Sequence, residues 1–316
     1  MAALALAIAC LAAPGALAQP SWPQKNVRFI VGFAPGGSVD PIARATGQAL
    51  SEKWKQNVII ENRAGAGGNT ATGLVARAEP DGYTILVTTS AIATNLSLSA
   101  NPGYALNDFT TAAVASTSPN LLIAAPQLKY NTLPQIIAAA RTEKFSFASS
   151  GIGTQPHFSG ELLFRILNKV EIPHVPFTGA GPAVIAVMGG HVPLAFITLP
   201  SAIEHIKAGT VKGVAVTTAA RLRDLPDVPT VNESGVGKLE AASVVAFFMP
   251  AKTPPDIVAK FNADLNALLS TGALDRQFAA AGAQPMILSQ NEAQAFIEAE
   301  FTKWAAVIKA ANIKPE

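Results

Sequence analysis

Two short segments rich in glycine and small hydroxyl residues have the composition of loops that bind an anion. Each follows an apolar run that predicts a strand and precedes a pattern that predicts a helix. Glycine lets a backbone approach a ligand closely, and the free N–H groups at a helix start favour negative charge. The first segment comprises Phe33, Ala34, Pro35, Gly36, Gly37 and Ser38, with Asp40 just beyond it. The second comprises Ser149, Ser150, Gly151, Gly153 and Thr154, followed by His157.

Each segment alone could equally form a tight turn that binds nothing. Weaker copies of the same pattern occur at residues 63–69 and 177–182, however, and these also follow predicted strands. Because ligands in open α/β sheets bind beyond the carboxyl ends of the strands, we expect the loops to converge on one cleft. By the same rule, Ile197 and Thr198 should line that cleft, since they end a predicted strand.

The polar residues of the two segments have predicted roles. Ser38 stands where the N-cap of the following helix belongs, and Asp40 falls in the first turn. We expect Asp40 to cap the helix and organise the loop rather than to catalyse, because no partnering base or nucleophile is near it. For His157 we expect ligand contact or loop ordering, with a capping or core histidine as the alternative. The remaining histidines are expected to be structural: His174, His191 and His205.

The chain lacks the motifs of common catalytic and nucleotide sites. No serine has glycine at both minus two and plus two, no Gly-x-x-x-x-Gly-Lys-Ser/Thr occurs, and no dinucleotide fingerprint is complete. No two histidines have the helical spacing of metal ligands. The sequence therefore predicts no catalytic residue, no metal and no cofactor.

Composition argues against a nucleic-acid-binding protein. Charged residues make up 14% of the chain and leave a net charge of only +2. There is no basic stripe and there are few aromatic residues, so the electrostatic footprint of a nucleic-acid-binding surface is missing.

The first residues have the pattern of a signal peptide. Residues 1–18 form an apolar run that ends in Ala16-Leu17-Ala18, a small-x-small cleavage pattern. Cys10, the only cysteine, lies inside this run, so the mature protein would have no disulfide and no thiol ligand. Lipid modification of Cys10 is the alternative.

Strands and helices alternate along the rest of the chain, which predicts an α/β fold with right-handed βαβ units and a parallel sheet. Strands are expected at residues 27–33, 58–61, 83–88, 121–124, 145–148, 172–175, 194–197, 212–216 and 243–249. The length predicts two domains. We place the first at residues 19–120 plus 242–316 and the second at residues 121–241. The last helix has an apolar stripe and is expected to pack against the first domain; the stripe comprises Ala293, Phe296, Ile297, Trp304 and Ile308.

A set of colinear motifs resembles the Bug receptors, the substrate-binding proteins of tripartite tricarboxylate transporters. The motifs are Phe33-Ala-Pro-Gly-Gly-Ser-Val-Asp40, Pro80-Asp-Gly-Tyr83, Ser150-Gly-Ile-Gly-Thr154 with His157, His174-Val-Pro-Phe-Thr-Gly179 and Pro226-Asp-Val-Pro-Thr230. They cover the mature chain in order. Such a set is more specific than any single glycine-rich loop.

The resemblance implies a two-domain periplasmic-binding-protein fold, the Venus flytrap, with the ligand cleft between the domains. It implies a monomeric periplasmic receptor that closes over an organic carboxylate, held by backbone N–H groups and waters, and that works with the membrane components of a transporter. Residues 33–38 with Asp40 would form one ligand loop and residues 149–154 with His157 the other. Further wall residues would be Thr89, Ser90, Phe177, Thr178 and Gly179.

Departures from the family pattern bear on the ligand. Ile197-Thr198 stands where the family often has Asp-Asn, and Ile185-Ala186 where it often has Thr-Asp. An apolar wall does not satisfy a second charged group but suits a methylene chain or ring. We therefore expect an aromatic acid or a longer dicarboxylate rather than citrate or a polar amino acid. The alternative is that these side chains pack in the core.

Two other functions stay open at this point. An extracytoplasmic sensor for a signalling kinase would use the same fold. A secreted α/β hydrolase or lyase would have to use Asp40 or His157.

Overall fold

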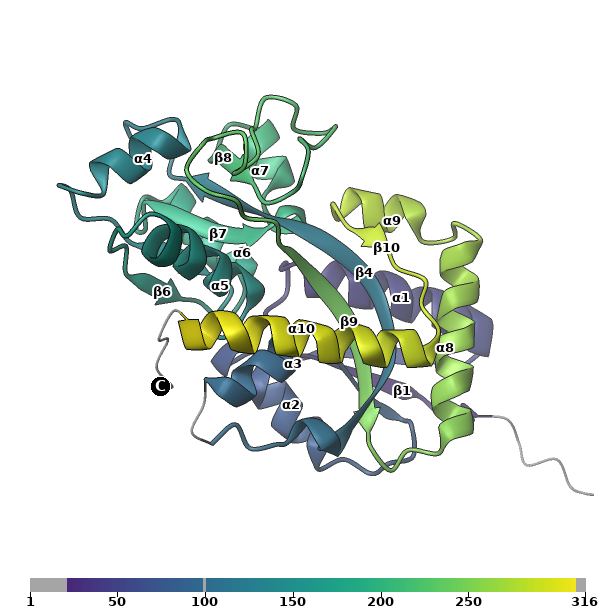
Figure 1. Cartoon of the computed structure of the whole chain (residues 1–316). Helices are drawn as coiled ribbons and strands as arrows, with labels where there is room; N and C mark the ends of the chain where they lie inside the picture. Colours follow the sequence, from purple (N-terminus) through teal and green to yellow (C-terminus); the bar gives the residue numbers. More distant parts are fainter. Residues whose placement is uncertain (1–21, 99–100, 311–316) are drawn as a thin grey trace, which may run out of the picture.

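A curled sheet runs through the molecule and helices flank it (Figure 1). The computed structural model describes residues 22–98 and 101–310. Within these ranges the sheet has ten strands in the order β2-β1-β3-β9-β4-β7-β5-β6, and β8 and β10 also pair with β4. The strands are β1 (Val27–Val31), β2 (Val58–Asn62), β3 (Thr84–Thr88), β4 (Phe109–Ala124), β5 (Phe147–Ser149), β6 (His174–Pro176), β7 (Leu194–Thr198), β8 (Lys212–Val216), β9 (Ala242–Pro250) and β10 (Gln284–Pro285).

The helices fill the connections between these strands. They are α1 (Val39–Trp54), α2 (Asn69–Ala76), α3 (Ala91–Thr94), α4 (Leu133–Ala139), α5 (Gln155–Glu161), α6 (Ala180–Met188), α7 (Ile203–Lys207), α8 (Pro255–Ser270), α9 (Asp275–Ala280) and α10 (Gln290–Ala310). Short 3₁₀ turns are η1 (Ala66–Gly68), η2 (Asn95–Ser97), η3 (Leu106–Asp108) and η5 (Leu199–Ser201), and η4 (Leu162–Leu167) is π-helical.

The two ends of the sheet are parallel and its centre is antiparallel. β1 pairs in parallel with β2 and β3, and β5 pairs in parallel with β6 and β7. β4 runs antiparallel to β7, β8 and β9, and β9 runs antiparallel to β3. The predicted parallel sheet is therefore right for the ends and wrong for the centre. Antiparallel neighbours need no crossover helix between them. The pairing of the central strands therefore does not follow from the alternation of strands and helices along the chain.

Most of β4 lacks the sequence signal of a strand. The sequence predicts only residues 121–124, whereas the strand begins at Phe109. Residues 110–119 are mainly alanine, serine and threonine, which give little hydrophobic pattern. Most are nevertheless buried, because β9 pairs along β4 and α8 and α10 pack on it.

Strands β1, β2 and β3 with α1, α2, α3 and α8 form an apolar unit that we call the first lobe. Successive side chains of a strand point to opposite faces of a sheet. Phe29 accordingly packs with Phe247 and Phe261, while Ile30 joins a cluster that contains Leu86. Packing on both faces fixes the carboxyl end of β1, where the first glycine-rich loop begins.

Strands β5, β6 and β7 with α4, α5 and α6 form the second lobe, which has the same construction. Phe147 packs on Phe164 with ring centroids 5.4 Å apart. Ala148, the next residue, belongs to a separate cluster with Ile197. The carboxyl end of β5 is thereby fixed where the second glycine-rich loop begins.

The central strands β4 and β9 join the lobes. They pair from Phe109 opposite Pro250 to Pro119 opposite Ala242. The predicted passages of the chain between domains, near residues 120 and 242, thus lie side by side on paired strands. The domain boundaries themselves stay a prediction.

Helix α10 lies across β4 and β9 (Figure 1) and contacts both lobes. Ala293 and Ile297 pack in the first-lobe cluster around Ile30. Trp304 stacks on Phe158 of the second lobe, with ring centroids 5.6 Å apart. The prediction that this helix packs against the first domain describes only its first half.

None of the described helices is both long and apolar enough to cross a membrane. The predicted signal peptide, residues 1–18, lies outside the described residues.

Candidate functional site

A narrow cavity lies at the start of α1, between loops of the two lobes. Its volume is about 10 Å³, which is room for about one water molecule. It is lined by Phe33, Gly37, Ser38, Val39, Thr89, Ser150, Thr154, Pro156, Ala180, Thr198 and Ser243. The lining comes from both predicted ligand loops and from the ends of β3 and β7, as expected for a ligand beyond the carboxyl ends of strands.

The polar groups in this cavity are hydroxyls. The hydroxyl-bearing residues are Ser38, Thr89, Ser150, Thr154, Thr198 and Ser243, and the described residues that line the cavity include no charged side chain. A hydroxyl group both donates and accepts hydrogen bonds. Thr154 Oγ1 and Ser243 Oγ already donate to the Gly151 carbonyl and to Asn120 Oδ1. The described lining therefore offers an acid several hydroxyl donors rather than all six, and no cation for an ion pair.

The start of α1 supplies backbone donors beside these hydroxyls. The first N–H groups of a helix have no intrahelical acceptor and carry the positive end of the helix dipole. Gly37, Ser38 and Val39 line the cavity at this point. Ser38 is the N-cap residue of α1, as predicted, but its side chain makes no capping hydrogen bond; the residue lines the cavity.

Asp40 organises the first loop from behind. Its carboxylate accepts hydrogen bonds from Arg44 Nε at 3.0 Å, Asn62 Nδ2 at 3.0 Å and the Gly36 N–H at 3.4 Å. Burial alone would raise the pKa of Asp40, but the bonds from Arg44, Asn62 and Gly36 outweigh it and hold the pKa below 3.8. The Asp40 carboxylate is thus an ionised brace for the loop, and it does not line the cavity.

Of the β7 residues, Thr198 lines the cavity. Its Oγ1 is buried and has no hydrogen-bond partner among the residues that the structure describes, although the side chain lines the cavity. A buried hydroxyl without a partner is costly, so a ligand group that bonds to it would be stabilising. Ile197 lies in the apolar cluster with Leu121, so the prediction that it lines the cleft is wrong.

The second loop uses much of its own backbone internally. The Gly151 N–H donates to Ser149 Oγ at 3.1 Å, the Gly153 N–H to His157 Nδ1 at 3.3 Å, and the Thr154 N–H to the Gly151 carbonyl at 3.3 Å. These donors are committed to the shape of the loop. The loop residues that line the cavity are Ser150 and Thr154.

Ser149 and His174 are close enough to resemble a nucleophile and its base. Their Oγ and Nε2 atoms are 2.6 Å apart. Ser149 is fully buried and does not line the cavity, and its Oγ already accepts the Gly151 N–H. The pair is therefore a structural support of the loop.

The two lobes touch directly at the cavity rim. The Ala34 N–H donates to the Thr178 carbonyl at 3.2 Å, and Thr94 Oγ1 donates to the Gly153 carbonyl at 2.6 Å. The backbone of Gly67 lies against Gly151. These contacts describe a closed arrangement, in which the remaining cavity is too small for an organic acid.

The predicted site residues divide into lining and supporting groups. Those outside the lining are Ala34, Pro35, Gly36, Asp40, Ser90, Ser149, Gly151, Gly153, His157, Phe177, Thr178 and Gly179. The structure adds Val39, Pro156, Ala180 and Ser243. The first three directly extend predicted loops and could have been included. Ser243, whose Oγ donates to Asn120 Oδ1 at 2.8 Å, is the second residue of β9, and no predicted loop marked it.

Comparison with known families agrees with this geometry. The family model of the tripartite tricarboxylate transporter family receptor, TctC, matches residues 42–313. The chain belongs to this family. The Bug resemblance predicted from the motifs is thus confirmed, and the family is one of solute-binding receptors.

Solved TctC and Bug structures share the fold over nearly the whole described chain. The periplasmic binding protein BugD is 30% identical with a TM-score of 0.86, covering 93% of this chain and 100% of BugD. R. palustris Rpa4515 with adipate is 34% identical with a TM-score of 0.89, covering 94% and 100%. MatC (Rpa3494) from Rhodopseudomonas palustris with bound malate is 29% identical with a TM-score of 0.84, covering 91% and 100%. The predicted α/β Venus flytrap fold is confirmed.

Proposed function

We propose that this TctC-family receptor captures an organic carboxylate in the cavity at the start of α1 and passes it to the membrane components of a tripartite tricarboxylate transporter. The observation that carries the proposal is a helix start surrounded by hydroxyls between two lobes. The family supports a periplasmic location and a transporter partner.

A carboxylate would be held by dipoles at this site. The N–H groups at the start of α1 favour an anion, and the hydroxyl-bearing residues Ser38 and Thr198 line the same cavity. Because no charged side chain lines the described cavity, neutralisation would come from several N–H and O–H donors. The lobes must open to admit a ligand, since the closed cavity is about 10 Å³.

The ligand we favour is a dicarboxylate with an extended methylene chain. Ile197 no longer supports this choice because it lies in the core. The support comes instead from the apolar part of the lining: Phe33, Val39, Pro156 and Ala180. Adipate, which is bound in one solved relative, belongs to this class. Malate, which is bound in another, is a shorter and more polar dicarboxylate. The length of the carbon chain is therefore the variable to test.

The direct test is calorimetry and thermal unfolding of residues 19–316 with adipate, malate, citrate and benzoate. A ligand at 100 times its Kd stabilises the folded state by about 2.7 kcal/mol. We expect adipate to raise the Tm and to bind more tightly than citrate. If no carboxylate binds, the proposed function is wrong; if citrate or malate binds more tightly than adipate, only the ligand class is wrong.

A Thr198→Val variant locates the site. Removing a hydroxyl that bonds a charged ligand should cost about 1.5 kcal/mol or more of binding, which is roughly tenfold in Kd. Thr46→Val is the matched control, because the Thr46 hydroxyl is also buried without a partner in the described residues but lies on α1 away from the cavity. Equal adipate affinity in both variants would place the ligand elsewhere.

A further inference from the structure

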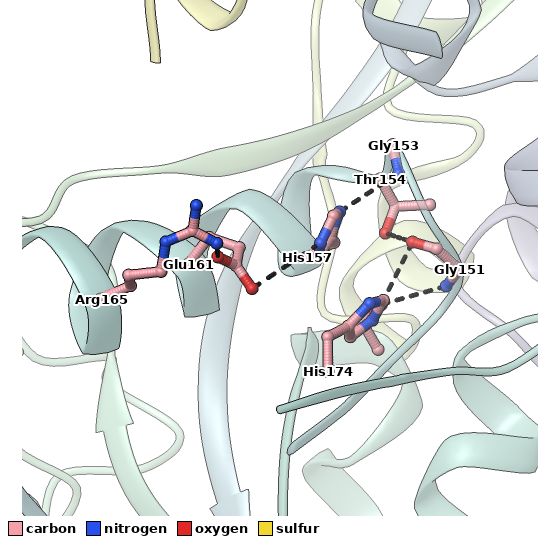
Figure 2. Close-up of polar contacts among 8 residues, drawn as sticks. Gly151, Gly153, Thr154, His157, Glu161, Arg165 and His174 are labelled. Atoms are coloured by element: carbon pink, nitrogen blue, oxygen red, sulfur yellow. Dashed lines mark hydrogen bonds and ion pairs between the residues drawn. The ribbon is translucent and has the colours of Figure 1, made fainter. Parts of the chain in front are cut away.

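Two histidines stack behind the second ligand loop (Figure 2). His157 on α5 and His174 on β6 have ring centroids 4.1 Å apart and planes inclined by 22°. Neither ring lines the cavity. Any effect of the rings on a ligand must therefore pass through the loop, residues 149–154.

His157 accepts a hydrogen bond from the backbone of this loop. The Gly153 N–H points at Nδ1 at 3.3 Å. An imidazole nitrogen accepts a hydrogen bond only when it carries no proton, so the ring proton of neutral His157 is on Nε2, which faces Glu161 at 4.0 Å. Figure 2 shows this row from Gly153 through His157 to Glu161. The observed loop thus requires an unprotonated Nδ1.

His174 supports the other end of the loop through Ser149. The Ser149 hydroxyl donates to the Gly151 carbonyl and accepts the Gly151 N–H, both at 3.1 Å. His174 Nε2 forms a hydrogen bond of 2.6 Å with the same Ser149 Oγ, and the tautomer of His174 decides which of the two atoms donates. The two histidines therefore fix Gly151 and Gly153 through different ring nitrogens.

Gly153 also joins the loop to the other lobe. Its carbonyl accepts the hydrogen bond from Thr94 Oγ1 of the first lobe at 2.6 Å, and a Cβ at this position would overlap the Asn95 side chain. One residue thus bonds to His157 through its N–H and to the closed first lobe through its carbonyl. A shift of Gly153 away from His157 would disturb lobe closure.

Charged side chains lie on one side of the stacked histidines. Glu161 faces His157 and is bound through its second carboxylate oxygen by Arg165 at 3.1 Å. Glu161, Arg165 and His174 line an outer groove together with Lys169 and Glu171. This groove gives protons a route to the histidines that does not cross the ligand cavity.

The other elements packed against α5 bring few charges. Strands β4, β5, β7 and β9 carry no titratable side chain. Helix α10 brings Glu300 and Lys303, which pair with each other at 3.4 Å. Glu161, Arg165 and the stacked rings are thus the nearest influences on His157.

Burial disfavours the charged form of both rings. Burial first, and then the charge of Arg165, lower the pKa of His157 from 6.5 to about 4. Burial and then His157 lower the pKa of His174. A base with a lowered pKa binds protons more readily when its environment is opened, so acid favours opening. The loop should lose stability as the pH falls from about 6.5 towards 4.

We propose that His157 is a positioning residue that holds Gly153, and through it the closed lobes, only while Nδ1 is unprotonated, so that acid weakens ligand binding. The proposal rests on the ligand site proposed above. Its Gly153 contact lies within the second lobe, so it is testable without ligand.

The ligand-free test is NMR of the imidazole nitrogens and of the Gly153 amide in residues 19–316. We expect the Nε2–H tautomer for His157 at pH 7, and a Gly153 amide resonance that moves with the protonation of His157. An Nδ1–H tautomer of His157 would overturn the proposal. So would a Gly153 amide resonance that does not move as His157 is titrated. Neither result depends on knowing the ligand.

The binding test compares His157→Asn and His157→Leu with the wild type, using adipate. Asparagine places an amide oxygen near the position of Nδ1, which accepts the Gly153 N–H and does not titrate, whereas leucine has no acceptor. At pH 7 we expect the Leu variant to bind roughly tenfold more weakly and the Asn variant to stay near wild type. Between pH 7 and pH 5 the wild type should weaken several-fold relative to the Asn variant.

This ratio separates the histidine from the ligand. Adipate itself takes up protons in this pH range, but it does so equally for both proteins. His191→Asn, at an exposed position, is the control for replacing a histidine and should follow the wild type. Parallel weakening of wild type and His157→Asn, or wild-type binding by His157→Leu, would overturn the proposal. Absence of adipate binding to the wild type at pH 7 would count against adipate as the ligand, and the spectra would still decide the role of His157.

Discussion

At the scale of single residues, Gly67 allows the lobes to approach closely because it has no side chain. It has a φ of +62°, and a Cβ built on it would overlap the carbonyl oxygen of Ile152 across the lobe contact. Gly67→Ala should hinder closure without removing any group that lines the cavity. We expect adipate to bind at least tenfold more weakly, which corresponds to about 1.4 kcal/mol, as measured by calorimetry.

Gly209→Ala is the matched control for this change. Gly209 has a similar φ of +69°, but a Cβ there would meet nothing within 4 Å. It therefore reproduces the backbone strain without the clash. Equal loss of adipate affinity in both variants would show that strain, rather than the lobe contact, is responsible.

Asp40 offers a second test at this scale. In Asp40→Asn, an NH₂ group replaces one acceptor oxygen and faces donors from Arg44, Asn62 or Gly36. Leaving a buried donor unpaired costs about 1–3 kcal/mol. We expect urea unfolding to show such a loss, and the exposed Asp224→Asn to show almost none.

The Asp40→Asn variant should also change how the stability of the folded protein depends on pH. Because its pKa is below the ordinary 3.8 in the folded protein, Asp40 stabilises the fold above about pH 4 and loses this effect as the pH falls through its folded pKa. The difference in stability between wild type and Asp40→Asn should shrink in acid. A difference that stays constant from pH 7 to pH 3 would contradict the ionised brace.

Residue types and local order predict part of the site but not all of it. Ser38 and Thr198 lie at a helix start and a strand end, so the rule for α/β sheets finds them. The rule cannot tell that the Ser38 side chain makes no capping bond to α1, because the sequence preference of an N-cap position does not show whether the side-chain bond forms. The place of Ser243 in the lining could not be predicted, because only the long-range pairing of β4 with β9 brings this residue to the cavity.

At the scale of elements, α10 ties the lobes together. Trp304 is nearly fully buried, stacks on Phe158 and donates to Glu300 at 2.9 Å. Trp304→Ala should destabilise the protein by about 3–5 kcal/mol, the usual range for a large buried side chain. Urea unfolding measures this, and Lys309→Ala at an exposed position of the same helix is the control. A loss below about 1 kcal/mol would mean that the second half of α10 contributes little.

Elements with strong periodicity were predictable, and those without it were not. The spacing of Ile42, Thr46 and Leu50 indicates a helix, and all three are buried in α1, which ends at Trp54. The first half of β4 consists of small residues whose burial depends on neighbours distant in sequence. The apolar stripe of α10 shows which face is buried, but a stripe cannot say that its two ends rest on different lobes.

At the scale of the whole molecule, binding should be accompanied by contraction. The closed cavity is about 10 Å³, so a ligand enters only when the lobes part, and hinge bending about paired strands is a common way to do so. We expect small-angle scattering to give a smaller radius of gyration with saturating adipate than without it. An unchanged radius at saturation would contradict the hinge, and Gly67→Ala should contract less than the wild type.

The overall architecture was predictable chiefly because motifs along the whole chain agree with one another. Alternation of elements indicates the α/β class, and the two glycine-rich loops indicate a shared cleft. The antiparallel centre of the sheet was not predictable from alternation, because a sequence records the order of strands but not which of them become neighbours.

The hydroxyl lining of the cavity affects how the receptor should respond to ionic strength. At 0.1 M, salt largely screens the attraction between exposed charges that lie more than about 10 Å apart. Short contacts to oriented dipoles inside a closed site are hardly screened. With no charged side chain lining the described cavity and a net charge of only +2, the chain has little means of drawing an anion from a distance. Capture of the ligand would then depend on random encounter, and its retention would depend on the closing of the lobes. A change in the surrounding salt concentration would therefore leave the lifetime of the complex almost unaltered.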